Sequence, residues 1–118
     1  RPPDERVHPQ GQEQAEWRQL LKEMNSCAED GDVAGAERLF LRIQDEVPQA
    51  QQRMLHNTFL KACANSGDLG RAETWLQGMQ AKRIRLNSKA LGKLIEAASK
   101  QGDAYATERW LEIFGEAF

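Results

Sequence analysis

Apolar side chains recur along this chain in groups whose members lie three or four residues apart, the spacing of one face of an α-helix. From residue 17 onward the spacing defines six such stripes, within residues 20–24, 39–43, 55–60, 75–79, 91–95 and 110–114. Valine and isoleucine, which are typical of strands, are scarce. The pattern therefore predicts an all-α protein of about six helices.

One phrase recurs between the two stripes of each successive pair. It reads "GDVAGAERLF" at 31–40, "GDLGRAETWL" at 67–76 and "GDAYATERWL" at 102–111. Successive copies begin 36 and 35 residues apart. Such a period is typical of a solenoid of two-helix units, each too small to bury its apolar face alone. We therefore expect a right-handed α-solenoid with units at 17–52, 53–87 and, incompletely, 88–118.

The first two letters of the phrase have a mechanical role in the predicted turn. Glycine adopts the left-handed conformation that ends the first helix of each pair. The aspartate that follows, Asp32, Asp68 or Asp103, caps the second helix through its side-chain oxygen and its charge. A small residue four positions later lets the paired helices approach closely: Ala36, Ala72 or Thr107.

Residues 1–16, "RPPDERVHPQGQEQAE", lack helical periodicity and carry almost no apolar side chain. A segment of this kind buries too little surface to offset the entropy lost on ordering. We therefore expect a polar, extended N-terminal tail at 1–16, followed by a helical repeat domain at 17–118. Where the tail is ordered, a partner surface is expected to hold it, rather than the short body of the domain.

The middle unit resembles a known repeat. The stretch 53–87, "RMLHNTFLKACANSGDLGRAETWLQGMQAKRIRLN", is similar to the pentatricopeptide repeat, which has two helices joined by a glycine turn and a closing linker. The matching positions are Asn57, Gly67, Ala72, Met79 and Asn87. The resemblance extends more loosely over 17–118, and the 34-residue period of the rival tetratricopeptide repeat fits less well.

The linker departs from the family pattern, because Arg83 and Leu86 stand where the family usually has glycine and proline. The resemblance implies a mitochondrial or chloroplast protein. It also implies binding of single-stranded RNA, with one base per repeat read by the fifth and last residues of the unit. Only the middle unit has a legible pair, Asn57 and Asn87, which resembles a pyrimidine-reading combination. One legible repeat contributes little affinity, about 1–3 kcal/mol per base.

Charge is distributed unevenly along the chain, whose net charge is −2. Residues 1–52 hold 6 basic and 11 acidic side chains (−5), residues 53–101 hold 9 and 3 (+6), and residues 102–118 hold 1 and 4 (−3). The central band either contacts phosphates or an acidic protein surface, or forms only the solvated faces of surface helices. No aromatic residue interleaves it on the predicted groove face. The band comprises Arg53, Lys61, Arg71, Lys82, Arg83, Arg85, Lys89, Lys93 and Lys100.

No motif of an active site is present. The histidines, His8 and His56, do not stand in a zinc-binding spacing with cysteine or carboxylate. Cys27 and Cys63 lie 36 residues apart, at equivalent repeat positions, so we interpret them as small packing residues. We expect no catalysis, cofactor, metal or small-molecule substrate. Since no apolar run approaches the roughly 18 residues that span a bilayer, we expect no membrane span.

The C-terminal stretch "RWLEIFGEAF" is rich in apolar residues. Either these side chains fold back on the third unit, or more chain covers them in a longer protein, or they form a docking surface for another subunit. The residues concerned are Trp110, Leu111, Ile113, Phe114 and Phe118.

Two functional hypotheses follow. The first is a non-catalytic scaffold or adaptor that binds other protein subunits within a large organellar assembly, such as a ribosome, a respiratory complex or a photosynthetic complex. The alternative is single-stranded RNA binding in organellar RNA processing or translation. The alternative predicts contacts from Asn57, Asn87, Lys61, Lys89 and Lys93.

Overall fold

The computed structural model describes residues 9–102 and 104–117, with side chains from 16 to 112 except 103 and 106. This part of the chain contains six α-helices, one short 3-10 turn at Gln49–Gln51 and no strand, which confirms the all-α prediction. The helices are α1 (Pro9–Glu29), α2 (Val33–Ile43), α3 (Gln52–Ser66), α4 (Leu69–Ala81), α5 (Ser88–Lys100) and α6 (Ala104–Ala117).

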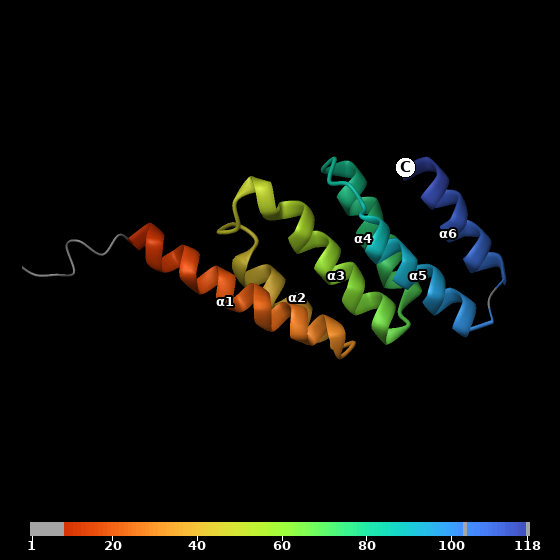
Figure 1. Cartoon of the computed structure of the whole chain (residues 1–118), viewed down its shortest axis with the longest axis horizontal. Helices are drawn as coiled ribbons and strands as arrows, with labels where there is room; N and C mark the ends of the chain where they lie inside the picture. The colour runs from red at the N-terminus through yellow and green to blue at the C-terminus, as the bar shows by residue number, and fades with distance from the viewer. Residues whose placement is uncertain (1–8, 103, 118) are drawn as a thin grey trace, which may run out of the picture.

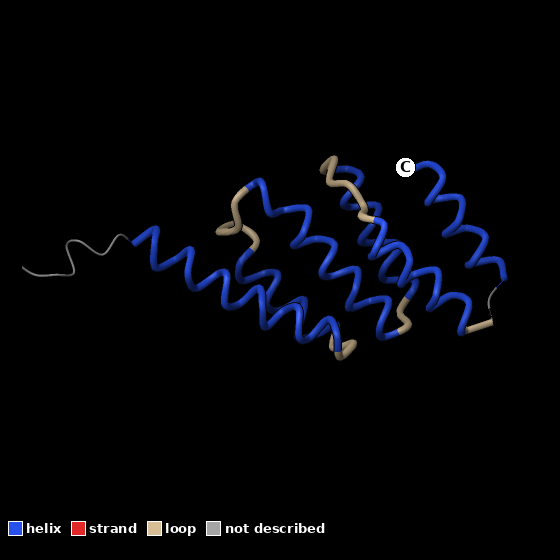
Figure 2. Tube along the Cα trace, in the orientation of Figure 1, coloured by secondary structure: helices blue, strands red, loops and turns tan. Residues whose placement is uncertain are grey.

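Successive helices turn back on one another, and Figures 1 and 2 show them lying side by side from α1 to α6. Helix α1 packs against α2 and α3, α3 against α4 and α5, and α5 against α6. Helices α1, α3 and α5 therefore form a continuous layer. Helix α2 packs against α1 and α3, α4 against α3 and α5, and α6 against α5. Surfaces that cross this layer combine residues from different repeats.

The turns follow the predicted glycine–aspartate device. Gly31, Gly67 and Gly102 have φ angles of +71°, +78° and +69°, in the left-handed region that side chains disfavour. Asp32 accepts the Gly35 N–H at 2.9 Å, and Asp68 accepts the Arg71 N–H at 3.1 Å. Both predicted caps within the described residues are confirmed, whereas Asp103 lies outside them.

Aromatic rings from three helices meet at the centre of the core. The ring of Phe59 on α3 lies 4.1 Å from that of Trp75 on α4, centroid to centroid, and the ring of Phe40 on α2 lies 4.7 Å from Trp75. The Trp75 indole N–H donates to the His56 carbonyl at 3.2 Å, so the polar edge of this ring is satisfied. The cluster therefore ties α2, α3 and α4 together.

The first helix begins earlier than expected, which corrects the boundary drawn at residue 17. Helix α1 starts at Pro9, so residues 9–16 are helical rather than extended, and the tail residues 1–8 lie outside the described residues. Proline is tolerated at the first helical position, and most residues that follow favour helix. Apolar periodicity marks only where a helix packs, and it therefore misses a solvent-facing extension.

The structure also corrects one residue of the expected C-terminal docking surface. Trp110 on α6 is only 2% exposed and belongs to the core, because the helix folds back on α5. Leu111, by contrast, is 52% exposed. The side chains of Ile113 and Phe114, and all of Phe118, lie outside the described residues.

Candidate functional site

A polar groove crosses the layer formed by α1, α3 and α5. It encloses about 200 Å³ and brings together all five residues of the RNA hypothesis, although they come from two repeats. We call it the lysine groove. Its lining residues are Asn25, Met54, Asn57, Thr58, Lys61, Asn87, Lys89, Ala90 and Lys93.

The side-chain amide of Asn57 is engaged inside the protein. Its Nδ2 donates to the carbonyls of Arg53 at 2.8 Å and Arg85 at 3.0 Å, while its Oδ1 accepts the Asn87 N–H at 2.9 Å. Asn57 is 3% exposed. Since both Nδ2 hydrogens are used, this side chain clamps the linker between α4 and α5 onto α3.

The side chain of Asn87 has a structural partner as well. Its Oδ1 accepts the Ala90 N–H at 2.7 Å, which makes Asn87 the N-cap of α5. The predicted base-reading pair is thus placed in one groove, but its amides hold the chain together. Reading a base through Asn57 requires these hydrogen bonds to break.

The three lysines of the groove differ in their partners. Lys61 donates to Asn25 Oδ1 at 3.1 Å and lies 3.8 Å from a Glu29 carboxylate oxygen, so it is tied to α1. Lys89 and Lys93 form no ion pair or hydrogen bond with any side chain that the structure describes. These two are the cations that the groove offers to a ligand.

Two arginines of the predicted basic band brace neighbouring segments. The guanidinium of Arg53 donates to the carbonyls of Arg85 at 3.2 Å and Leu86 at 3.3 Å. Arg71 forms an ion pair with Glu37 across α4 and α2. Their charges are therefore committed within the fold.

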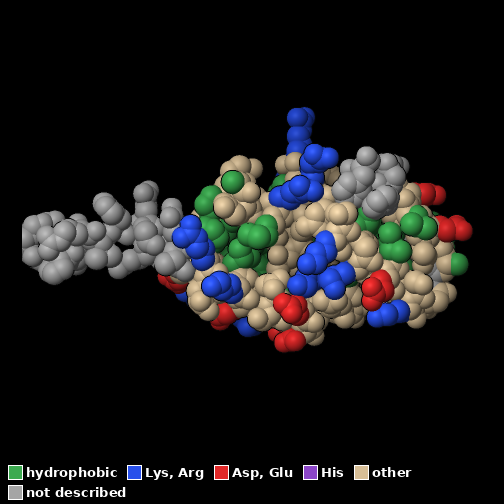
Figure 3. Space-filling view, viewed as in Figure 1, with side chains coloured by type: hydrophobic (Ala, Val, Ile, Leu, Met, Phe, Trp, Pro, Cys, Tyr) green, Lys and Arg blue, Asp and Glu red, His purple; other side chains and the backbone are tan. Residues whose placement is uncertain are grey.

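The remaining residues of the basic band comprise one paired lysine and five cations without an ion pair among the described residues. Lys100 pairs with Glu96 one turn earlier on α5, at 3.0 Å. The others carry no ion pair within the described part of the chain, and we call them the free cations. Lys and Arg side chains gather over the middle of the face drawn in Figure 3. The free cations are Lys82, Arg83, Arg85, Lys89 and Lys93.

Arg83 has a φ of +59°, a conformation that costs a residue with a side chain about 1–2 kcal/mol. Glycine adopts this conformation freely. We expect Arg83→Gly to raise the free energy of unfolding by up to about 1 kcal/mol, as measured by urea denaturation. The matched control is Arg85→Gly, which removes the same charge at a residue without positive φ. The explanation fails if the two variants have equal stability.

A second pocket, of about 400 Å³, lies between α2 and α4, and we call it the His56 pocket. His56, which the sequence left without a role, is 3% exposed and belongs to its wall. The sequence does mark His56 as unusual. The equivalent positions of the other repeats, 36 residues before and 35 after, hold the apolar residues Leu20 and Leu91. The lining residues are Glu37, His56, Gly70, Arg71, Thr74, Trp75, Gly78, Met79 and Lys82.

The protonation of His56 follows from its contacts. Its Nδ1 lies 2.9 Å from the Gln52 carbonyl, which only accepts, so Nδ1 carries the proton. Burial, aided by the positive charge of Lys82 and opposed by the Gln52 hydrogen bond, lowers the pKa of the imidazole. The neutral ring therefore presents Nε2 as a buried acceptor, and Nε2 has no partner among the described residues.

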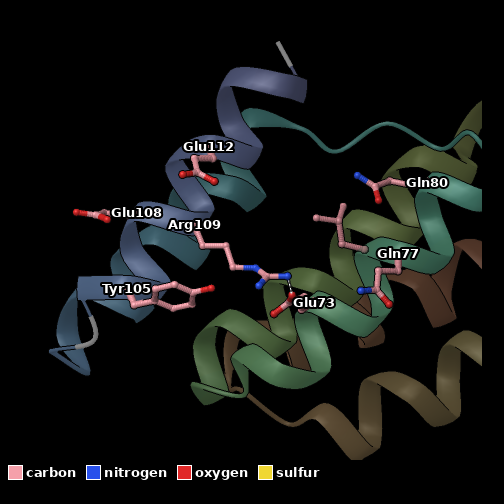
Figure 4. A pocket seen from close by; sticks show the side chains of 8 residues that line it. Glu73, Gln77, Gln80, Tyr105, Glu108, Arg109 and Glu112 are labelled. Atoms are coloured by element: carbon pink, nitrogen blue, oxygen red, sulfur yellow. Dashed lines mark hydrogen bonds and ion pairs between the residues drawn. The ribbon is translucent and has the colours of Figure 1, made fainter.

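A third pocket, of about 380 Å³, separates α4 from α6. Figure 4 shows Arg109 reaching from α6 toward Glu73 on α4, with which it forms an ion pair. Tyr105, Glu108 and Glu112 border the space, and Tyr105 is exposed. The ion pair bridges the two helices, so Arg109 has a structural role and needs no ligand to explain its charge.

The described residues contain no histidine, cysteine and carboxylate cluster suited to a metal ion. Both thiols are free, and burial raises the pKa of Cys63 to about 12, so it stays protonated near neutral pH. None of the described helices combines the length and apolar content needed to cross a membrane. Comparison with protein-family models, curated protein sequences and solved structures finds no match to this chain.

Proposed function

We propose that this chain is a non-catalytic scaffold, a pentatricopeptide-like α-solenoid that binds an acidic protein surface within a larger organellar assembly of the mitochondrion or chloroplast. The observation that carries the proposal is the set of five free cations around the α4–α5 linker and α5, unpaired within the described part of the chain. Complementary charge on a partner would both steer and orient its docking. The solenoid arrangement is proposed from the repeat pattern, and the organelle is proposed from the resemblance to pentatricopeptide repeats.

Two features of the lysine groove favour a protein partner over RNA. The amide of Asn57 is bonded to backbone groups and is buried, so it has no donor left for a base edge. The described lining of the groove contains no aromatic residue, whereas single-strand binders use aromatic rings as stacking platforms. Met54 instead offers a half-exposed apolar side chain beside the lysines.

Single-stranded RNA binding remains the second candidate, in organellar RNA processing or translation. It is favoured by one observation, the convergence of Lys61, Lys89 and Lys93 in one groove. Contacts to phosphates from Lys89 and Lys93, the two unpaired lysines of the groove, would bind RNA without reading its sequence, and the affinity would fall steeply with salt.

The test is co-purification of the tagged full chain from its source cells, before and after ribonuclease treatment, with cross-links mapped by mass spectrometry. We expect a protein partner in fixed ratio that survives ribonuclease and cross-links near the lysine groove. The double variant Lys89→Glu with Lys93→Glu is expected to reduce its recovery about tenfold or more, because like-charge contacts at an interface cost several kcal/mol.

The matched control reverses two exposed cations outside the groove, Lys22→Glu with Arg38→Glu, and is expected to retain the partner. Fluorescence anisotropy of the purified chain with an oligouridine, at low and at physiological salt, measures the RNA alternative. Salt-sensitive RNA binding that Lys89→Glu with Lys93→Glu abolishes, together with loss of all partners after ribonuclease, would overturn the scaffold in favour of RNA binding.

A further inference from the structure

The His56 pocket arises where the middle repeat departs from its neighbours. Three of its residues, Gly70, Thr74 and Gly78, follow one another at intervals of four along α4 and so share one face of the helix. The positions 36 residues earlier hold Ala34, Arg38 and Arg42, and those 35 later hold Tyr105, Arg109 and Ile113. Only the middle unit therefore has small residues at all three positions.

The small residues are not required by close packing inside the chain. A Cβ added at Gly78 would meet no atom within 4 Å, and one added at Gly70 would approach only an Asp68 oxygen, at 4.0 Å. Glycine inside a helix costs about 1 kcal/mol relative to alanine. The fold alone thus gives no reason for two glycines on this face.

His56 is the second, independent departure. The other repeats place leucine at its position, so a polar ring has replaced an apolar side chain in the core. Its Nδ1 is bonded to the Gln52 carbonyl, but Nε2 is buried without a partner among the described residues. Leaving a buried acceptor unpaired is unfavourable, and natural structures rarely do so without a reason.

The other residues that line the His56 pocket indicate the chemistry of a ligand that would fit it. The partly buried ring of Trp75 supplies apolar surface, and the volume of about 400 Å³ lies in the range of about 300–1,000 Å³ typical of ligand pockets. Lys82 at the edge is exposed and is one of the free cations, while Arg71 is neutralised by Glu37. The pocket therefore suits an occupant with an apolar part, a hydrogen-bond donor for His56 Nε2 and a negative charge beside Lys82.

We infer that the His56 pocket binds a tyrosine side chain from an acidic segment of a partner protein. The tyrosine ring packs on Trp75, and its hydroxyl donates to His56 Nε2. A carboxylate next to that tyrosine pairs with Lys82. The inference rests on the proposed function in one respect only, in taking the partner to be a protein. The pocket lies between α2 and α4 and shares no lining residue with the lysine groove.

The test titrates capped pentapeptides into the full ¹⁵N-labelled chain and follows the Trp75 indole N–H and the His56 ring nitrogens by NMR. The probes are Asp-Glu-Tyr-Asp-Glu and the same peptide with phenylalanine in place of tyrosine. We expect saturable shifts at both residues with the tyrosine peptide. We expect about fivefold weaker binding of the phenylalanine peptide, because it lacks one hydrogen bond.

Gly78→Leu blocks the pocket and Gly92→Leu is its matched control, since a Cβ at either glycine meets nothing within 4 Å and Gly92 lies on α5, outside the pocket. We expect the first variant to weaken binding of the tyrosine peptide about tenfold or more, and the control to leave it unchanged. Circular dichroism confirms that both remain helical. His56→Leu, which restores the residue of the other repeats, is expected to make the two peptides bind equally.

The inference is overturned if the tyrosine peptide causes no saturable shift at Trp75 and His56, or if Gly78→Leu binds as well as Gly92→Leu. It is also overturned if both peptides bind the wild-type chain equally. A titration with adenosine monophosphate that shifts these signals when the peptides do not would assign the pocket to a nucleotide instead. None of these outcomes depends on Lys89 or Lys93, so failure here is distinct from failure of the co-purification test.

Discussion

Replacing Phe59 with alanine is expected to lower the free energy of unfolding by about 3–5 kcal/mol, the cost typical of truncating a large core aromatic residue. Phe59 is fully buried, and its ring lies 4.1 Å from that of Trp75 and 6.4 Å from that of Phe40. The variant loses the burial of the ring and leaves a cavity where three helices meet. Urea denaturation followed by circular dichroism measures the loss.

The control for this variant is Leu41→Ala on α2, which removes a large apolar side chain that is 60% exposed. We expect a change within about 0.5 kcal/mol, as is usual for surface substitutions. Similar losses for Phe59→Ala and Leu41→Ala would contradict the placement of the aromatic cluster at the centre of the core.

The second large effect is expected at Asn57, where alanine should lower the free energy of unfolding by about 1–3 kcal/mol. The substitution strands the Asn87 N–H, which Asn57 now satisfies at 2.9 Å, and an unsatisfied buried donor costs about 1–3 kcal/mol. The Arg85 carbonyl loses the Asn57 donor at 3.0 Å but keeps the Arg53 guanidinium at 3.2 Å. The Arg53 carbonyl loses a contact as well. Denaturation measures the total, and hydrogen exchange at the Asn87 amide reports the freed linker directly.

Thr58→Ala is the neighbouring control. The Thr58 hydroxyl donates only to the Met54 carbonyl one turn earlier on the same helix, at 2.8 Å. Its removal is expected to change stability by less than about 0.5 kcal/mol, because no group of another segment is left without a partner. Unchanged protection of the Asn87 amide in Asn57→Ala would show that Asn57 does not hold the linker.

Phe59 and Asn57 show that the sequence predicted the core more successfully than it predicted the site. Phe59 belongs to an apolar stripe at helical spacing, and the structure buries it as that stripe predicts. Asn57 also lies on the predicted helix, but its polar side chain suggested contact with a ligand. The structure buries it and pairs it with residues 28 and 30 positions later in the chain.

The lysines show an intermediate case. Their clustering within 53–101 was visible from charge alone, and the structure brings Lys61, Lys89 and Lys93 into one groove. Whether a lysine already pairs within the protein depends on its neighbours from other repeats. Lys61 reaches Asn25, 36 residues earlier, while Lys89 and Lys93 form no ion pair or hydrogen bond with the side chains that the structure describes.

Local chemistry accounts for what the sequence determined by itself. The helices follow from apolar periodicity, the turns from glycines that adopt positive φ, and the caps from aspartates that accept an N–H three residues away. Each of these depends on contacts within a few positions, so the residues near each site suffice to predict it. The same limit explains the missed start of α1, whose first turns carry no apolar stripe.

Only the tertiary structure decided which polar groups are already used and which are left for a partner. A hydrogen bond from Asn57 to the linker, or a missing one at His56 Nε2, depends on how helices from different repeats pack. Packing places residues of distant sequence position within about 3 Å, and no local pattern encodes that proximity. The fold class therefore followed from the sequence, whereas the pocket at His56 emerged only from the assembled helices.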